Sequence, residues 1–166
     1  IIKTFAEMGY EVKYRILCAA DYGVPQKRER LITIGIRNDL ASKCQFVFPQ
    51  VHDYKPVVRD IQLDVNPDTT QCARYSQNKE AVFALVPPGG YWRDIDPKIA
   101  KEYMKSCWDM EGGRTGILRR MSLDEPSLTV LTSPSQKQTE RCHPTETRPL
   151  TIREYARIQT FPDDWR

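Results

Sequence analysis

The chain has 166 residues, of which 40% are hydrophobic; this excludes a disordered tail and allows one domain or two small lobes. The formal net charge of +3 is too small to indicate nucleic-acid binding by itself. Residues 112–153 hold seven Lys or Arg against four Asp or Glu, so the rest of the chain is neutral. This basic stretch fits a solvated surface as well as a binding face.

Cysteine usage and hydropathy favour a reduced, cytoplasmic protein. The five cysteines form no C-x-x-C pair, and the sequence has no signal peptide and no apolar run of about 18 residues. A zinc site is not expected, although Cys142 and His143 are adjacent. Because the chain starts at Ile1 inside a helical pattern, we interpret it as a piece of a longer protein.

The first residues predict a helix that ends at Gly9, followed by a strand over residues 10–17. One face of that strand consists of Val12, Tyr14 and Ile16. Residues 31–36 are β-branched and apolar on both faces, which is typical of a strand buried in a layered α/β sheet. The order helix, strand, connection, strand predicts the end of such a sheet.

Prolines punctuate the chain after Asn38 and predict a boundary near residues 45–60, beyond which a second lobe begins. Ser76 predicts the N-cap of a helix that runs to about Leu85, and Asp96 before Pro97 predicts the start of another. The apolar stripe of this second helix is expected to be core and comprises Ile99, Ala100, Tyr103, Met104, Cys107 and Trp108.

Two further elements follow. Residues 128–132 predict a short strand, and Thr151 with Glu154 forms the capping box of a final helix. The side chains expected on one face of this helix are Ile152, Tyr155 and Ile158.

A polar motif lies in residues 21–31, where a tight turn precedes Gln26, Arg28 and Arg30 at a spacing of two. In an extended chain such residues point the same way, so we expect one amide and two guanidiniums on one face. That row suits an anionic backbone or the edge of a base. The alternative is an edge strand whose charges block aggregation.

The second motif, residues 148–165, is a capped amphipathic helix with an aromatic end, and on physical grounds it is structural. Together, the two motifs resemble the glutamine-and-two-arginines motif and the scaffold helix of the DNA cytosine-5 methyltransferase family, in the same order. Between them, residues 87–92, 112–114 and 125–130 are similar to the recognition region of bacterial restriction-modification members.

The resemblance implies roles for particular residues. Arg30 would help to hold a flipped cytosine, with Arg28 and Gln26 binding phosphate or ordering the pocket, because an extruded base needs hydrogen bonds and its backbone needs positive charge. The implied base-edge and phosphate contacts are Thr129, Val130, Ser135, Gln136, Lys137, Gln138, Thr139 and Arg141. The residues expected to serve structure around the last helix are Arg148, Arg153, Glu154 and Gln159.

The fold implied is α/β: the C-terminal end of a Rossmann-like methyltransferase sheet plus an irregular α+β target-recognition lobe. Residues 1–45 would belong to the catalytic domain and residues 46–147 to the target-recognition region. Residues 148–166 would form the scaffold helix that bridges the two lobes.

The chemistry implied by the resemblance is incomplete in this sequence. The family attacks C6 of cytosine with a cysteine that follows a proline, and S-adenosylmethionine then methylates C5. None of the five cysteines follows a proline, and the glycine-rich cofactor turn, the glutamate that pairs with the cytosine ring and the final motif are also absent. We expect no metal, cofactor binding mainly by a missing N-terminal part, and no methyl transfer by this chain alone.

A fragment and a subunit of a split enzyme both fit these observations. The expected partners are double-stranded DNA and the missing catalytic half, in a bacterial, nucleoid-associated setting without a membrane. Because the first helix and strand would lack sheet partners, we also expect self-association. The competing classes are a stand-alone sequence-specific DNA-binding module and a purely structural domain.

Overall fold

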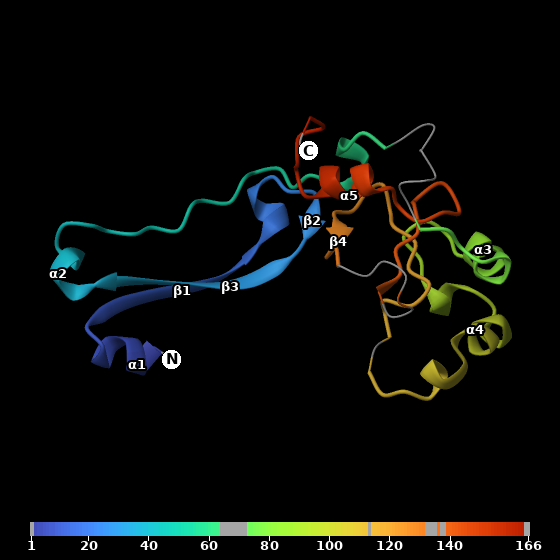
Figure 1. Ribbon diagram of the computed structural model, residues 1–166, viewed down its shortest axis with the longest axis horizontal. Coiled ribbons are helices and arrows are strands. Elements are labelled where there is room, and N and C mark those ends of the chain that lie inside the picture. Colours follow the sequence, from blue (N-terminus) through green and yellow to red (C-terminus); the bar gives the residue numbers. More distant parts are fainter. Residues whose placement is uncertain (1, 64–72, 113, 132–135, 137–138, 165–166) are drawn as a thin grey trace.

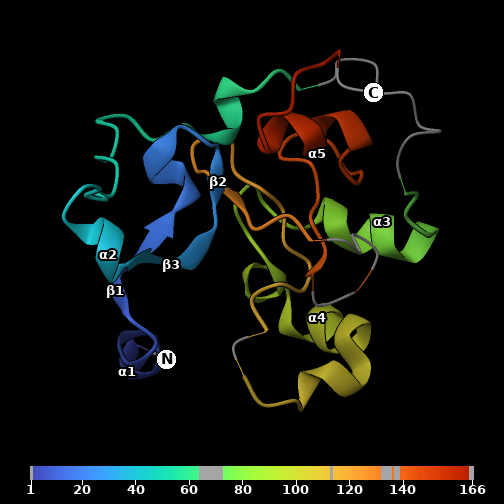
Figure 2. The same cartoon turned by 60° about the vertical axis from the view of Figure 1, so that its left-hand side comes forward.

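The protein consists of a long arm and a lobe (Figure 1). The computed structural model describes residues 2–63, 73–112, 114–131, 136 and 139–164. The arm holds the N-terminal elements, and the lobe holds helices α3, α4 and α5, as a turned view also shows (Figure 2). Among the described residues, none of the helices has the length and apolarity that a membrane span requires.

The arm is built from helix α1 (Ile2–Glu7), strands β1 (Tyr10–Cys18) and β3 (Glu29–Arg37), and the short helix α2 (Asn38–Ala41). β1 and β3 are antiparallel, from Tyr10 opposite Arg37 to Cys18 opposite Glu29. A 3-10 turn, Ala19–Tyr22, starts the connection between them. The predicted helix and first strand are confirmed, and Gly9 has the positive φ of 84° expected after a helix.

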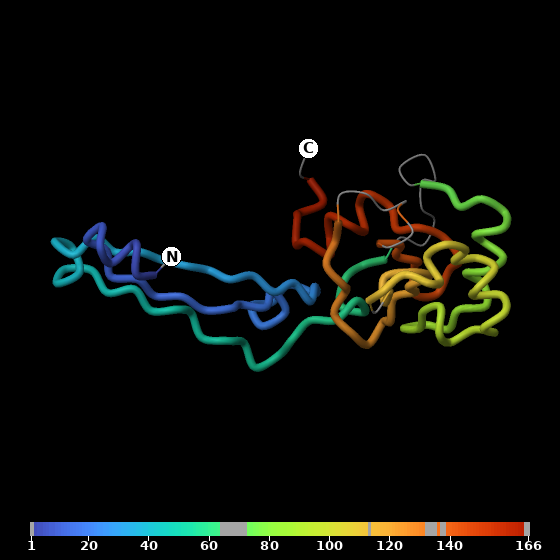
Figure 3. The backbone as a smooth tube through the Cα atoms, turned by 90° about the horizontal axis from the view of Figure 1, so that it is seen from below, coloured from blue at the N-terminus to red at the C-terminus, as the bar shows by residue number. Residues whose placement is uncertain are grey.

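The expectation that residues 31–36 are buried on both faces is wrong for the described chain. β1 and β3 form a two-stranded sheet, and Leu31 is 60% exposed. Residues 42–57 run back along the arm and cover part of it (Figure 3). In this segment Phe46 accepts a hydrogen bond from Lys13, and Phe48 lies under Arg15. Because residues 42–57 cover only part of this two-stranded sheet, apolar side chains of the described chain remain exposed to solvent.

The lobe contains α3 (Gln77–Ala84), α4 (Pro97–Met104) and α5 (Ile152–Ile158), with 3-10 turns at Val58–Asp60, Trp92–Asp94 and Lys105–Trp108. The predicted caps are confirmed, since the side chains of Ser76 and Asp96 accept hydrogen bonds from backbone N–H groups at the starts of α3 and α4. A core cluster joins α3, α4 and the segments around Leu118 and Cys142.

The second predicted helix is shorter than its apolar stripe. α4 ends at Met104, because Lys105 has a φ of 51°, and a 3-10 turn carries Cys107 and Trp108 back to the core. Ile99 is exposed, whereas the three other helical members of the stripe are buried: Ala100, Tyr103 and Met104.

Strands β2 (Gln26–Lys27) and β4 (Ser127–Leu128) pair in parallel and join the arm to the lobe. β4 begins one residue before the predicted strand of residues 128–132 and ends at Leu128; Thr132 lies outside the described residues. Ser127 N–H also donates to the carbonyl of Pro25 at 2.9 Å. The prediction therefore located the strand correctly but made it longer than β4.

Helix α5 starts with the predicted capping box. Thr151 Oγ1 accepts from the Glu154 N–H at 3.1 Å, and Glu154 Oε2 accepts from the Thr151 N–H at 2.8 Å. Ile158 is buried in a second core cluster with Tyr155 packed against it, whereas Ile152 is 67% exposed. Position 152 is the first helical residue and turns outward.

Replacement of Glu154 by Ala should strongly destabilise the lobe. Glu154 is fully buried and receives two hydrogen bonds from Arg148, so its removal leaves a mostly buried guanidinium without its carboxylate and also breaks the cap. We expect a loss of about 3–5 kcal/mol in the free energy of unfolding in urea. Asp163→Ala removes an exposed partner of Arg157 and should cost at most about 1 kcal/mol. Equal losses for the two variants would contradict this assignment.

Apolar side chains on the arm should make the isolated chain self-associate. Ile16 and Leu31 lie opposite each other in the sheet and are 66% and 60% exposed. Sedimentation velocity should show dimers or larger species, and Ile16→Lys should shift them toward monomer. Val47→Lys alters an exposed apolar residue outside the sheet and serves as the control. A sharply monomeric unaltered chain would refute the prediction.

Candidate nucleic-acid interface

The first candidate residue, Gln26, is buried at the junction between arm and lobe. Its side chain is 2% exposed, and its Oε1 accepts the N–H of Val130 at 3.4 Å. Thr129 Oγ1 donates to the carbonyl of Lys27 at 3.1 Å. The structure therefore brings the Thr129–Val130 pair into direct contact with the Gln26 strand, although 102 residues separate Thr129 from Lys27 in sequence.

The expected row of Gln26, Arg28 and Arg30 on one face is divided in the structure. Strand pairing stops at Arg28, whose carbonyl accepts the N–H of Ala19 at 2.9 Å, and resumes in β3. Gln26 is buried, Arg28 is half-buried and Arg30 is exposed. The reason is the change of partner, since Gln26 pairs with β4 whereas Arg30 pairs with Leu17 of β1.

Neither arginine of this motif has an acidic partner among the described residues. Arg30 Nη1 donates to the neighbouring carbonyl of Glu29 at 2.6 Å, and Arg28 forms only backbone hydrogen bonds with the described part of the chain. Both guanidiniums therefore keep donors for an anion or a base edge.

The candidate recognition segment is described in part. Gln136 is exposed, and Thr139 turns back to it through a backbone hydrogen bond of 3.0 Å. Arg141 is half-buried, donates from Nη1 to the carbonyl of Glu140 at 2.7 Å, and has a buried Nε without a partner among the described residues. Burial lowers the pKa of Arg141. The other three expected contacts lie outside the described residues: Ser135, Lys137 and Gln138.

Arg120 is a structural residue that the sequence did not single out. It is 5% exposed, and its two terminal nitrogens donate to four acceptors. The acceptors are the carbonyls of His143 (3.1 Å), Glu146 (2.9 Å) and Phe83 (2.8 Å) and the hydroxyl of Thr147 (3.0 Å). One buried guanidinium thus links α3 to residues 143–147. The available signal in the sequence is the pair of adjacent arginines at 119 and 120, which fits surface charge equally well.

Glu140 is the matching buried acid. Its carboxylate lies 2.8 Å from Lys79 Nζ, accepts from the hydroxyl of Tyr103 at 3.0 Å and accepts from the Leu118 N–H at 3.2 Å. These partners on α3, α4 and the following segment account for its charge, so Glu140 holds the core together.

His143 is fixed beside helix α5. Its Nδ1 accepts the Glu146 N–H at 3.1 Å, and its Nε2 lies 3.5 Å from Glu154 Oε1. Burial lowers the pKa of His143, and the positive charge of Arg148 acts in the same direction. Burial also raises the pKa of the adjacent Cys142 thiol. Among the described residues, no three His, Cys, Asp or Glu side chains gather as a metal site requires.

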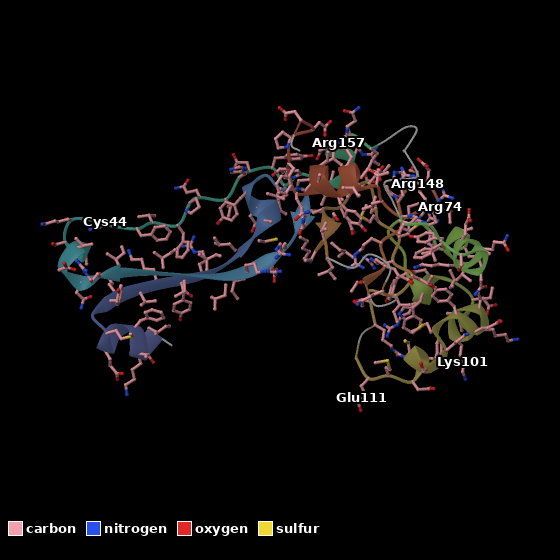
Figure 4. The ribbon with its side chains drawn as sticks, viewed as in Figure 1. Cys44, Arg74, Lys101, Glu111, Arg148 and Arg157 are labelled. Atoms are coloured by element: carbon pink, nitrogen blue, oxygen red, sulfur yellow. The ribbon has the colours of Figure 1, made fainter. Side chains whose placement is uncertain are left out.

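The residues expected to serve structure around α5 have mostly intramolecular contacts. Arg148 binds Glu154, and Arg153 Nη1 lies 4.0 Å from Asp163 Oδ1. Arg157, which was not among the expected residues, binds Asp163 at 2.8 Å, and both Arg148 and Arg157 are labelled in Figure 4. Gln159 Nε2 donates to the carbonyl of Tyr155 at 3.5 Å. An open groove of about 350 Å³ runs along the helix, lined by Ile152, Arg153, Tyr155, Ala156, Gln159, Phe161 and Pro162.

Comparison with known proteins extends over the whole length of the chain. Residues 1–166 match the model of the C-5 cytosine-specific DNA methylase family. The chain is 54% identical to the type II methyltransferase M.Sau96I of Staphylococcus aureus, over 99% of this chain and 38% of that protein. It is 50% identical to M.PspPI of a Psychrobacter strain, over 99% of this chain and 41% of that protein.

A third relative is the type II methyltransferase M.Eco47II of Escherichia coli, at 48% identity over 96% of this chain and 40% of that protein. The chain thus spans about two fifths of the length of these relatives. The expected family is confirmed: the chain belongs to the C-5 cytosine-specific DNA methylase family.

Proposed function

We propose that this chain is the target-recognition part of a DNA cytosine-5 methyltransferase, which transfers a methyl group from S-adenosylmethionine to C5 of cytosine in a specific duplex sequence. The observation that carries the proposal is the β2–β4 junction, where Gln26 holds Val130 and Lys27 holds Thr129. A contact with DNA by the recognition lobe is thereby coupled to the segment that carries Arg28 and Arg30.

In this proposal residues 1–45 belong to the catalytic domain, and β1 and β3 are the last strands of its Rossmann-like sheet. The exposed apolar faces of the arm are what such strands would bury against further strands and helices. Residues 46–147 form the target-recognition region, and residues 148–166 form the scaffold helix between the two. The buried Arg148–Glu154 pair supports this last role, because it fixes α5 to the lobe.

Arg30 and Arg28 act on the extruded nucleotide. A flipped cytosine presents polar ring atoms that lose water in the pocket, and an exposed guanidinium supplies planar donors for them. In this proposal Arg28, which is half-buried beside the junction, binds the distorted phosphate backbone. Gln26 is a positioning residue in this scheme, because its carbonyl oxygen is already bound to Val130.

The described residues do not fit the nucleophile or a cofactor site. Cys142 is buried with a raised thiol pKa, Cys44 is exposed, and no cysteine follows a proline as the family's nucleophile does. S-adenosylmethionine supplies the methyl group when bound, and we assign its binding and the thiolate to the rest of the enzyme. The chain alone is therefore inactive.

Methyl transfer should require complementation. Labelled methyl groups from S-adenosylmethionine should reach mixed-sequence duplex DNA when the chain is combined with the N-terminal part of M.Sau96I, and not with either part alone. The methylated sites would identify the target sequence. Activity of the chain alone would overturn the assignment of the nucleophile to the missing part. Duplex binding without activity in the mixture would favour the alternative, a stand-alone DNA-binding module.

Arg30→Ala should reduce methylation by the complemented enzyme by about 10²–10³-fold, the usual effect of removing one preorganised donor at a reacting centre. Duplex binding by the chain alone should change little, because Arg30 contacts only the flipped base. Arg37→Ala, at the other end of β3 and paired with Asp39, is the control and should leave methylation unchanged. Full activity of Arg30→Ala would exclude the proposed role.

A further inference from the structure

Arg119 and Arg141 each directly precede one residue of a parallel bridge in the lobe. Arg120 is paired with Cys142, and the Cys142 N–H donates to the Arg119 carbonyl at 2.9 Å. Arg120 and Cys142 are both buried. Because side chains alternate along an extended chain, Arg119 and Arg141 leave the bridge on its other side. Their charges are close enough that Arg119 acts on the pKa of Arg141.

Neither of these two guanidiniums is neutralised within the described chain. Arg119 lies over the ring of Tyr91 at 5.4 Å and makes no side-chain hydrogen bond or ion pair with the described residues. Arg141 donates to the carbonyl of Glu140 and keeps a buried Nε unpaired within that part of the chain. The nearby carboxylate of Glu140 is already bound to Lys79, Tyr103 and the Leu118 N–H.

The electrostatic environment of this pair differs from that of the structural arginines. Burial is the main cause that lowers the pKa of Arg141, and the like charge of Arg119 lowers it further. Hydrogen bonds to Glu154 and Glu146 outweigh burial at Arg148 and raise its pKa. Two adjacent guanidiniums repel each other, and an anion bound between them removes that repulsion. Their planar forks match the oxygens of a phosphate.

The position of the pair connects it to the junction. Arg119 lines a small crevice with Ser127 and Leu128 of β4, and β4 pairs with β2, where Gln26 lies. Glu125 lines the same crevice but forms no ion pair with Arg119. Arg119 is thus connected through β4 to the strand that precedes Arg28.

We propose that Arg119 and Arg141 together bind a backbone phosphate of duplex DNA. The inference rests on the proposed function and deepens it, because it assigns a phosphate contact to Arg119 and makes Arg141 a phosphate rather than a base-edge contact. The site anchors the recognition lobe on the duplex irrespective of sequence. Its ligand is a phosphodiester, which must be distinguished from free phosphate.

The test uses the 166-residue chain and a fluorescent mixed-sequence duplex, with the association constant measured by anisotropy over a series of salt concentrations. Arg119→Gln should weaken binding and reduce the slope of log K against log salt by about 0.9, the value for one lost phosphate contact. Arg119→Lys should bind more weakly than the unaltered chain but keep the slope, because charge remains while the paired donors are lost.

Lys101→Gln is the charge control. Lys101 lies on α4, away from β4 (Figure 4), and its loss removes the same unit charge. It should leave the slope unchanged, and thermal unfolding should show that each variant is folded. Arg141→Gln should reproduce Arg119→Gln, and the double variant should lose no more slope than either single variant, since one phosphate is shared.

The outcomes separate this inference from the function on which it rests. Binding by the unaltered chain with the same slope in Arg119→Gln overturns the phosphate site and leaves target recognition intact. No duplex binding by the unaltered chain overturns both. Calorimetric binding of inorganic phosphate that Arg119→Gln abolishes, with duplex binding unaffected, shows a free-phosphate site and overturns the assignment to DNA.

Discussion

The lobe depends on one buried ion pair, Glu154 with Arg148. A carboxylate that is fully removed from water is tolerated only when cations and hydrogen-bond donors surround it. Here Arg148 supplies two N–H donors at 2.9 Å each, and the Thr151 backbone supplies a third. Because these partners lie before and at the start of α5, the pair fixes both the direction of the helix and the segment that leads into it.

From this pair, buried polar contacts continue across the lobe. Residues 143–148 are held at one end by Glu154 and at the other by Arg120, whose guanidinium also reaches the Phe83 carbonyl in α3. Glu140 then joins α3 to α4 through Lys79 and Tyr103. Irregular segments have few regular backbone hydrogen bonds, so buried charges with several partners each replace the order that a sheet would provide. Among the residues that the structure describes, the arm has no comparable cluster of buried charges, and many of its apolar side chains are exposed.

Features that depend on contacts between residues near in sequence could be predicted, whereas features that depend on contacts between distant residues could not. Helix starts depend on contacts two or three residues apart, so Ser76, Asp96 and Thr151 located α3, α4 and α5. The burial of residues 31–36 depends on neighbours beyond β1, and pattern alone could not supply them. The contact of Gln26 with Val130 joins residues 104 apart, which spacing within a motif cannot reveal. Family resemblance indicated both partners as site residues but did not show that they touch.

The intramolecular partners of each arginine distinguish structural arginines from candidate binding ones, which residue type alone cannot do. Arg119 and Arg120 are adjacent but differ in their contacts. Arg120 donates to four protein acceptors in the interior, whereas Arg119 lies over an aromatic ring and has no acidic partner among the described residues. Desolvating a guanidinium costs several kcal/mol unless acceptors replace water. The four acceptors at its terminal nitrogens make Arg120 a structural residue, although its Nε has no partner among the described residues. By the same criterion, Arg148 and Arg157 are structural residues at α5, because Arg148 pairs with Glu154 and Arg157 pairs with Asp163. In our proposal the guanidiniums that bind DNA are those of Arg28, Arg30, Arg119 and Arg141, none of which has an acidic partner among the described residues.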